Sequence, residues 1–334
     1  MSSLESPVGV RPASITLVGG SGRSGTTLLR RLLGRHPKVC EVPEWRLPVD
    51  PGGLVDFYAA MGAAWTPLLF DVHYRRLAVL LRQVGSKSVL ASLYRRAVHG
   101  SGLARRVSLN LDLPYGAVDA SLFCPGYPQL AQALLDDLRS LEYRAIWTGS
   151  PFLANGRTAL GGPFEPETLA AILGRFYRQV VKGTLQAYGG EHYVEKNTWY
   201  PLVFDRFLEL VPEARLVNIW RDPRDVVCSM VEQRWAPSDL LSAARYYRAI
   251  MDRWYAVRSQ LPAGSFLDVF YEELVTKPED VLERIAAFAG IPLSPGPYGL
   301  SSSSIGRWQR GLRPGQVEQI LPYFASELGE KGSP

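Results

Sequence analysis

The stretch "VGGSGRSGTTLLRRLLGRHP" (residues 18–37) decides which fold we expect. The residues "ASITLVGG" (13–20) predict a short buried strand, and the apolar spacing from Ser24 to Gly34 predicts an amphipathic helix that ends before Pro37. A glycine-rich turn between a strand and a helix directs free backbone N–H groups to one point, where the helix dipole adds positive potential. The stretch therefore predicts an anion-binding loop.

The loop lacks one part of the common phosphate-binding motif. The spacing from Gly20 to Gly25 fits G-x-x-x-x-G-K-[ST], but Thr26 occupies the lysine position. Nucleotide hydrolases and kinases of this class place that lysine on the β- and γ-phosphates and usually hold magnesium nearby. Arg23 supplies a cation elsewhere in the loop, and Thr27 adds a second hydroxyl donor. We therefore expect an anion other than a transferable γ-phosphate.

Three later segments extend the predicted sheet. "HYVEKN" (192–197), "ARLVNIWRD" (214–222) and "SFLDVFYEEL" (265–274) each predict a strand, and helical periodicity follows each of them. Strands that alternate with helices indicate an α/β fold, here a doubly wound parallel sheet flanked by helices and similar to that of P-loop NTPases.

The middle of the chain has a different pattern. Between about residues 50 and 190, helical patterns are broken by Gly and Pro clusters, and no clear alternation typical of a strand is present. We interpret this segment as a mostly helical insertion that caps the sheet. The chain (1–334) is then a single domain whose nucleotide-binding core comprises residues 14–48 and 192–320.

The composition limits the classes of partner. The chain has 334 residues, of which 46% are hydrophobic and 21% charged, as in soluble globular proteins. The formal charge is only +5 and no long Lys/Arg run is present, so we expect no nucleic-acid partner. Neither a signal-peptide pattern nor an apolar run of about 18 residues occurs, which predicts no integral membrane segment and a cytoplasmic location. Cys40, Cys124 and Cys228 have no disulfide or zinc-site spacing, so we expect buried thiols and no metal.

A second anion site is predicted in "RLVNIWRDPRDVVCSM" (215–230). The strand delivers Arg221 at its end, and the following helix carries Ser229, so a guanidinium and a hydroxyl can meet one anion. Two alternatives stay open: Arg221 can instead pair with Asp225, and Asp222 can be a magnesium-binding carboxylate. Two anion sites at adjacent strand ends indicate a nucleotide that has phosphates at two places on its ribose.

These two motifs resemble those of sulfotransferases that use 3′-phosphoadenosine 5′-phosphosulfate. The similarity is greatest to the tyrosylprotein and carbohydrate branch, in a soluble form of bacterial type. The resemblance implies that Arg221 and Ser229 hold the 3′-phosphate, and that Tyr271 and Arg307, the latter in "SSSSIGRWQRGL" (301–312), also contact the donor. It further implies that the 5′-phosphosulfate is bound by Gly22, Arg23, Ser24, Gly25, Thr26 and Thr27. The branch often has a basic residue where this chain has Gln233.

The resemblance also implies the catalytic residues. The branch uses a glutamate shortly after the first helix to remove the acceptor proton, which indicates Glu44 in "VPEWRLP", with Glu41 as the alternative. Arg46 then takes the substrate-contacting position, and Lys196 approaches the sulfuryl group together with Arg23. The related aryl branch uses a histidine, but none of the four histidines, His36, His73, His99 and His192, lies in a recognisable motif.

The expected reaction is in-line sulfuryl transfer to a hydroxyl, with 3′-phosphoadenosine 5′-phosphate as the product and no metal. We expect a small-molecule, glycolipid or sugar-bearing acceptor, in a pocket walled by aromatic residues of the insertion, namely Trp65, Phe70, Tyr74, Trp147, Phe152, Phe164 and Tyr177. Two other classes stay open: a P-loop kinase of nucleotides or small molecules, and a module that binds the bisphosphate without turnover. The sequence also leaves a homodimer open.

Overall fold

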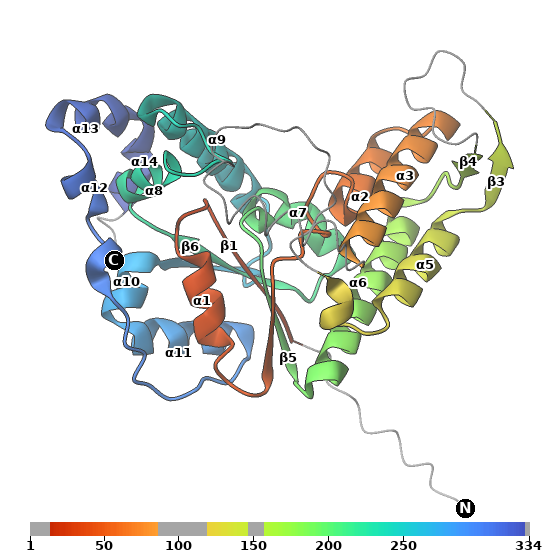
Figure 1. The fold of residues 1–334 in the computed structure, drawn as a ribbon, viewed down its shortest axis with the longest axis horizontal. Helices are drawn as coiled ribbons and strands as arrows, with labels where there is room; N and C mark the ends of the chain where they lie inside the picture. Colours follow the sequence, from red (N-terminus) through yellow and green to blue (C-terminus); the bar gives the residue numbers. More distant parts are fainter. Residues whose placement is uncertain (1–13, 86–118, 146–156, 331–334) are drawn as a thin grey trace, which may run out of the picture.

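The computed structural model describes residues 14–85, 119–145 and 157–330 (Figure 1). Five strands form its central sheet in the order β2-β5-β1-β6-β7, and all four pairings are parallel. The strands are β1 (Ser14–Gly20), β2 (Val39–Val42), β5 (His192–Lys196), β6 (Arg215–Trp220) and β7 (Phe266–Phe270). This architecture confirms the predicted α/β class with a parallel sheet.

Both faces of the sheet are buried. In β1, Ile15 and Leu17 belong to the core on one face, whereas Val18 belongs to the core on the other. A strand that is covered on both sides is apolar throughout, which explains the run "ITLV". The Val18 face is covered by α1 (Thr26–Leu33), α10 (Tyr271–Thr276) and α11 (Pro278–Ala289). The opposite face is covered by α6 (Pro166–Tyr188), α7 (Tyr200–Leu210) and α9 (Leu240–Arg258).

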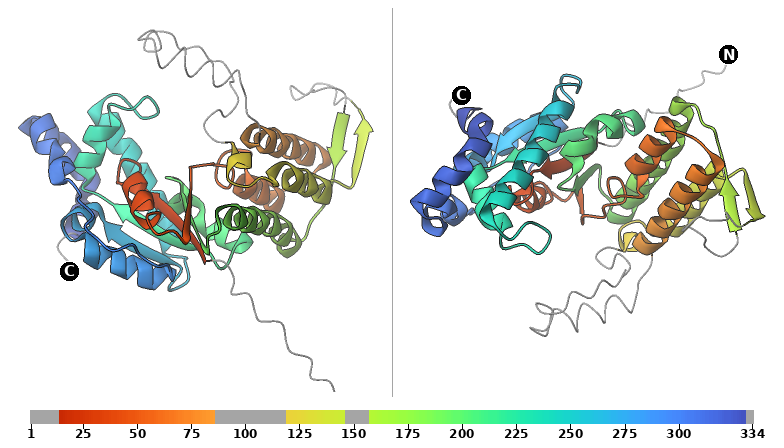
Figure 2. Two further views of the ribbon diagram at one scale, coloured as in Figure 1. Left: turned by 60° about the horizontal axis from the view of Figure 1, so that its bottom comes forward. Right: turned by 90° about the horizontal axis from the view of Figure 1, so that it is seen from above.

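The insertion is mostly helical, as predicted, and its helix α6 covers part of one face of the sheet, whereas its other described helices lie beside the sheet. It comprises α2 (Leu54–Ala63), α3 (Pro67–Val84), α5 (Tyr127–Leu138) and α6 (Pro166–Tyr188). Figures 1 and 2 show these helices as a lobe beside the sheet, with α6 packed against β5 and β2. The apolar faces of these helices and one face of the sheet belong to the same hydrophobic core. Packing of the other helices against α6 therefore holds the lobe beside the sheet rather than over its strand ends.

Two short features of the chain were not expected. The four residues of β2 form an edge strand, and the insertion contains an antiparallel pair, β3 (Leu141–Arg144) with β4 (Arg157–Leu160). The strand predicted over 265–274 ends at Phe270, because Tyr271 begins α10. Segments of four residues are too short for their periodicity to separate a strand from a loop.

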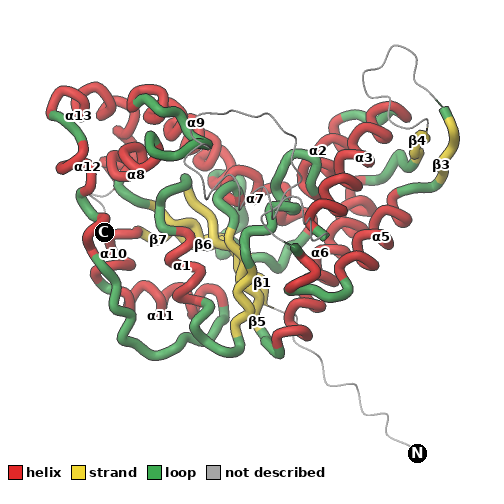
Figure 3. Tube along the Cα trace, in the orientation of Figure 1, coloured by secondary structure: helices red, strands yellow, loops and turns green. Residues whose placement is uncertain are grey.

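The C-terminal part consists of short helices, drawn in red in Figure 3. They are α12 (Arg307–Gly311), α13 (Pro314–Ile320) and α14 (Ala325–Glu330), and α12 packs against α8 (Pro223–Met230), which follows β6. Glu327 of α14 is buried and accepts hydrogen bonds from Arg248 and Tyr255 of α9, which holds α14 against α9. The three cysteines are buried and unpaired, as predicted. None of the described helices is long and apolar enough to cross a membrane.

Candidate functional site

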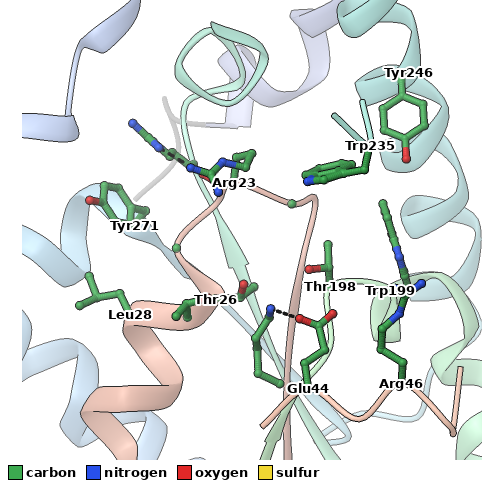
Figure 4. Close-up of a pocket in the computed structure, with 15 residues that line it drawn as sticks. Arg23, Thr26, Leu28, Glu44, Arg46, Thr198, Trp199, Trp235, Tyr246 and Tyr271 are labelled. Carbon is green, nitrogen blue, oxygen red and sulfur yellow. Dashed lines mark hydrogen bonds and ion pairs between the residues drawn. The ribbon is translucent and has the colours of Figure 1, made fainter. Parts of the chain in front are cut away.

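A cavity of about 770 Å³ lies at the carboxyl ends of the strands (Figure 4). Each of the five parallel strands delivers at least one lining residue at its end or within two residues of it. In sheet order these residues include Glu44, Lys196, Gly22, Arg221 and Tyr271. Ligand sites of open parallel sheets lie at this edge, because the loops that follow the strands converge there.

The loop between β1 and α1 exposes backbone rather than side-chain caps. Gly25 adopts a left-handed conformation (φ 104°) at the N-cap of α1, and no side chain caps the helix. The first N–H groups of α1 are therefore left for an external acceptor at the positive end of the helix dipole. Gly25 has no room for a side chain, since a Cβ atom there would lie 2.5 Å from Cδ2 of Tyr271.

Two arginines of the cavity have an uncommon backbone. Arg23 (φ 57°) and Arg46 (φ 54°) are the two non-glycine residues with positive φ in the described part of the chain, and both line the cavity. Such conformations cost about 1–3 kcal/mol and persist where the surroundings enforce them, often at functional sites. The Nε of Arg46 also donates to Asp50 Oδ1 at 2.8 Å, which directs this side chain along the cavity wall.

Most of the predicted loop residues lie together at the cavity. Gly22, Arg23, Gly25, Thr26 and Thr27 line it, whereas Ser24 is fully buried behind them. Its Oγ has no hydrogen-bond partner in the structure. A buried, unsatisfied hydroxyl costs free energy, so Ser24 is a group that a small shift of the loop or a ligand can satisfy.

Glu44 and Lys196 form an ion pair on the floor of the cavity. The sheet register explains this contact, because Val42 of β2 is paired with Glu195 of β5. Lys196 follows Glu195 directly and Glu44 lies two residues after Val42, so the two side chains leave neighbouring strands at the same level. Both side chains are only partly exposed. The alternative base, Glu41, lies on β2 with its Oε2 3.3 Å from Nε of Arg30, and it is not a lining residue of this cavity.

Arg221 is almost completely buried and connects several elements. Its guanidinium lies 4.9 Å from the ring centroid of Tyr271, and Nη1 donates to the carbonyl of Arg23 at 3.1 Å. Nη2 donates to the carbonyl of Ser304 and lies 3.4 Å from Asp225 Oδ2, so the alternative pairing with Asp225 is present. The Nε of Arg221 has no partner and remains a buried donor.

Positive charge accumulates around the loop. Nε of Arg23 donates to Ser229 Oγ at 2.9 Å, which brings the two predicted anion motifs into contact. Partial burial and then the nearby charges of Arg221 and Arg307 lower the pKa of Arg23, whereas Glu232 raises it. Neighbouring cations repel one another unless an anion lies between them, so the arrangement favours a bound anion.

Arg307 and Ser229 are not lining residues of this cavity. Arg307 pairs instead with Glu232, and Ser229 is buried behind Arg23. The segment around Arg307 is held by the fully buried Asp225, whose oxygens accept the backbone N–H groups of Gly306 and Trp308 at 2.9 Å each. Gln233 donates to the carbonyl of Ser229 at 3.2 Å.

The open alternative for Asp222 is disfavoured by its contacts. Its carboxylate accepts from Nε and Nη2 of Arg224, at 3.0 and 2.7 Å, and from the backbone N–H of Arg224 as the N-cap of α8. Among the described residues, no group of three or more His, Cys, Asp or Glu residues has the geometry of a metal site. A carboxylate that is engaged by a guanidinium is a poor magnesium ligand.

The aromatic residues at the cavity are not the ones that the sequence predicted. Its wall contains Trp199, Trp235 and Tyr246, together with Thr198 and Leu28. None of the expected insertion aromatics in the described residues is a lining residue, because Trp65, Phe70, Tyr74, Phe164 and Tyr177 pack in or against the core. Trp147 and Phe152 lie outside the described residues, as does His99. The position of Trp199, three residues after Lys196, was a usable signal, whereas nothing in the sequence marks Trp235.

Comparisons with known proteins identify the family of this chain. A protein-family model described as "Sulfotransferase family" matches residues 125–295. A sulfotransferase domain from the curacin biosynthetic pathway is 16% identical, with a TM-score of 0.47 and coverage of 94% of this chain and 98% of that chain. A sulfotransferase domain from the Synechococcus PCC 7002 olefin synthase is also 16% identical, with a TM-score of 0.47 and coverages of 97% and 98%.

Sulfotransferase STF9 from Mycobacterium avium is 17% identical, with a TM-score of 0.45, and the match covers 96% of this chain and 77% of that chain. No curated protein matches the sequence.

Proposed function

This chain belongs to the sulfotransferase family, and we propose that it transfers a sulfuryl group from 3′-phosphoadenosine 5′-phosphosulfate to an acceptor hydroxyl. The acceptor is a small molecule, a glycolipid or a sugar-bearing compound. One observation carries the proposal: the Glu44–Lys196 pair lies in the same cavity as a phosphate loop that has no lysine. A base and a cation beside an anion cradle suit group transfer from an anionic donor.

The residues present fit a donor with two anionic groups. The free N–H groups at the start of α1, with Thr26 and Thr27, suit the 5′-phosphosulfate. The buried Nε of Arg221 is a donor without a partner, and the Arg23–Ser229 contact lies beside it, which suits the 3′-phosphate. The contact of Arg221 with the Tyr271 ring holds this guanidinium at the cavity.

In the proposed reaction, the acceptor oxygen forms a bond to sulfur while the bond from sulfur to the phosphate oxygen breaks. The bound donor supplies the sulfuryl group and leaves as 3′-phosphoadenosine 5′-phosphate. Glu44 takes the hydroxyl proton and becomes neutral. Because a neutral carboxyl no longer holds the ammonium, Lys196 becomes free to stabilise the charge that grows on the leaving oxygen, together with Arg23. Proton transfer and leaving-group stabilisation are thus linked through one ion pair.

A comparison of ligands tests the donor class. Thermal unfolding is measured with adenosine 3′,5′-bisphosphate in the presence of a chelator, and separately with ATP and magnesium. We expect the bisphosphate to raise the midpoint, since a ligand at 100 times its Kd stabilises by about 2.7 kcal/mol. Stabilisation by magnesium ATP alone would instead support the kinase. Binding of the bisphosphate without sulfuryl transfer from radiolabelled donor to any member of an acceptor panel would support a binding module.

A further inference from the structure

The cavity has two aromatic sides, separated by the anion-binding loop. At Gly25 the loop touches Tyr271, whereas at Gly22 a Cβ atom would lie 3.1 Å from Cη2 of Trp235. Figure 4 shows Tyr271 and Leu28 on one side, and Trp199, Trp235 and Tyr246 on the other, with Glu44 between and below them. We name the second group of three residues the aromatic wall.

The proposed function, on which this inference rests, assigns the two sides. Arg221 stacks on Tyr271, so the nucleotide extends from the loop toward Tyr271. In-line transfer requires the attacking and leaving oxygens to lie on opposite sides of sulfur. With sulfur near Glu44 and Lys196, the acceptor must therefore enter from the side of the aromatic wall.

Two indole rings dominate this side of the cavity, next to Arg46 and Thr198. The rings of Trp199 and Trp235 meet edge to face, with centroids 6.2 Å apart and an interplanar angle of 87°. Trp235 is 49% exposed, although burial of so large a side chain would be favourable. An exposed tryptophan beside reacting groups offers a surface that a ligand can cover.

We propose that Trp199 and Trp235 form the acceptor subsite, and that they select acceptors whose hydroxyl is carried on a ring. A ring packs flat against an indole and keeps its hydroxyl at a fixed position beside Glu44, whereas an open chain gains less contact and no fixed orientation. A phenol ring and a sugar ring share this chemistry, and the experiment separates them.

The test uses the full chain with Trp235→Ala and the rescue variant Trp235→Phe. Tyr188→Ala is the matched control, because Tyr188 is an exposed aromatic residue (56%) at the end of α6 and is not a lining residue of the cavity. The probes are 4-methylphenol, methyl glucopyranoside and hexan-1-ol. Calorimetry measures the binding of each probe to the protein saturated with adenosine 3′,5′-bisphosphate, and steady-state kinetics give KM and kcat.

We expect Trp235→Ala to weaken binding and raise KM about tenfold for at least one ring probe, as the loss of an aromatic contact predicts. The binding and the KM of hexan-1-ol should change much less, and the affinity for the bisphosphate should not change. Trp235→Phe should recover most of the loss, and Tyr188→Ala should behave as the parent. The ring probe that responds identifies the acceptor class.

If Trp235→Ala weakened the binding of ring and open-chain probes equally, or of no probe at all, the proposed subsite would be overturned. Bisphosphate binding and turnover by the same protein would show that the proposed function still stands. A parent protein that does not bind the bisphosphate would overturn both.

Discussion

The proposed donor side and the aromatic wall of the cavity are built in different ways. On the donor side, one continuous segment from Gly22 to Leu28 supplies backbone N–H groups, and the ends of β6 and β7 add Arg221 and Tyr271. The aromatic wall consists of side chains that start at three places: the beginning of α7, the loop before α9, and α9 itself. A backbone cradle binds one kind of group, whereas a side-chain wall can change its specificity without changing the sheet.

The largest expected effect tests the residue pair that lies between the two sides. Glu44→Gln should lower kcat by about 10²–10⁴-fold, because the amide cannot accept the hydroxyl proton. Bisphosphate affinity should change little, since Glu44 faces Lys196 rather than the loop. Glu41→Gln is the matched control and should keep its turnover, as Glu41 pairs with Arg30 outside the cavity. A normal kcat for Glu44→Gln together with a low kcat for Glu41→Gln would identify Glu41 as the base instead.

The second prediction concerns the joint between the insertion and the sheet. Glu195 is fully buried and accepts hydroxyl bonds from Tyr177 of α6, Tyr193 of β5 and Tyr200 of α7, at 2.8 to 3.1 Å. Burial raises the pKa of Glu195 to about 7, although these donors oppose the shift. The folded chain therefore holds its proton to a higher pH than the unfolded chain does.

The sign of the pH dependence follows from this raised pKa. Between pH 4.5 and 7 the unfolded chain loses the proton first, so the free energy of unfolding falls as the pH rises, and the loss is complete above pH 7. Relative to that of Glu195→Gln, the free energy of unfolding of the parent should fall by about 2 kcal/mol between pH 5 and pH 7.5. Urea unfolding at the two pH values measures this difference, and parallel pH profiles of the two proteins would contradict it.

A third prediction separates backbone strain from site geometry. Gly25→Ala should lower stability by about 1–2 kcal/mol through its left-handed φ, and its methyl group should displace Tyr271 and weaken bisphosphate binding. Gly189→Ala has a similar positive φ (66°) but no atom within 4 Å of the new Cβ. The control should share the stability loss, measured by urea unfolding, and keep the affinity, measured by calorimetry. Equal affinities in both variants would contradict the role of the Gly25–Tyr271 contact.

The gathering of the loop residues at one cavity could be predicted from the sequence because its determinants are local, and their role in donor binding stays a prediction. Glycine spacing, a strand before it and a helix after it together define an anion loop, and Arg221 directly follows β6, a strand that pairs with β1. The aromatic wall could not be predicted, because Trp235 lies in a loop whose path depends on the packing of α9 against α7. The many aromatic residues of the insertion instead predicted that it lines the acceptor pocket. Residues such as Phe70 and Tyr177, however, are buried in the hydrophobic core. Aromatic residues are frequent in both cores and pockets, and periodicity alone does not separate the two.

The smallest expected effect addresses Arg307, which the resemblance assigns to the 3′-phosphate but which pairs with Glu232. Glu232→Gln removes the carboxylate that competes with an anion for Arg307 and that also acts on Arg23. Because exposed ion pairs contribute about 0.2–1 kcal/mol, bisphosphate binding should become about two- to fivefold tighter at low salt, and the gain should vanish at 1 M salt. Glu142→Gln, which removes a paired surface carboxylate from the insertion, should leave the affinity unchanged. Weaker binding by Glu232→Gln would mean that Glu232 holds Arg307 in place for the ligand, so that the donor side also depends on side-chain contacts between distant segments.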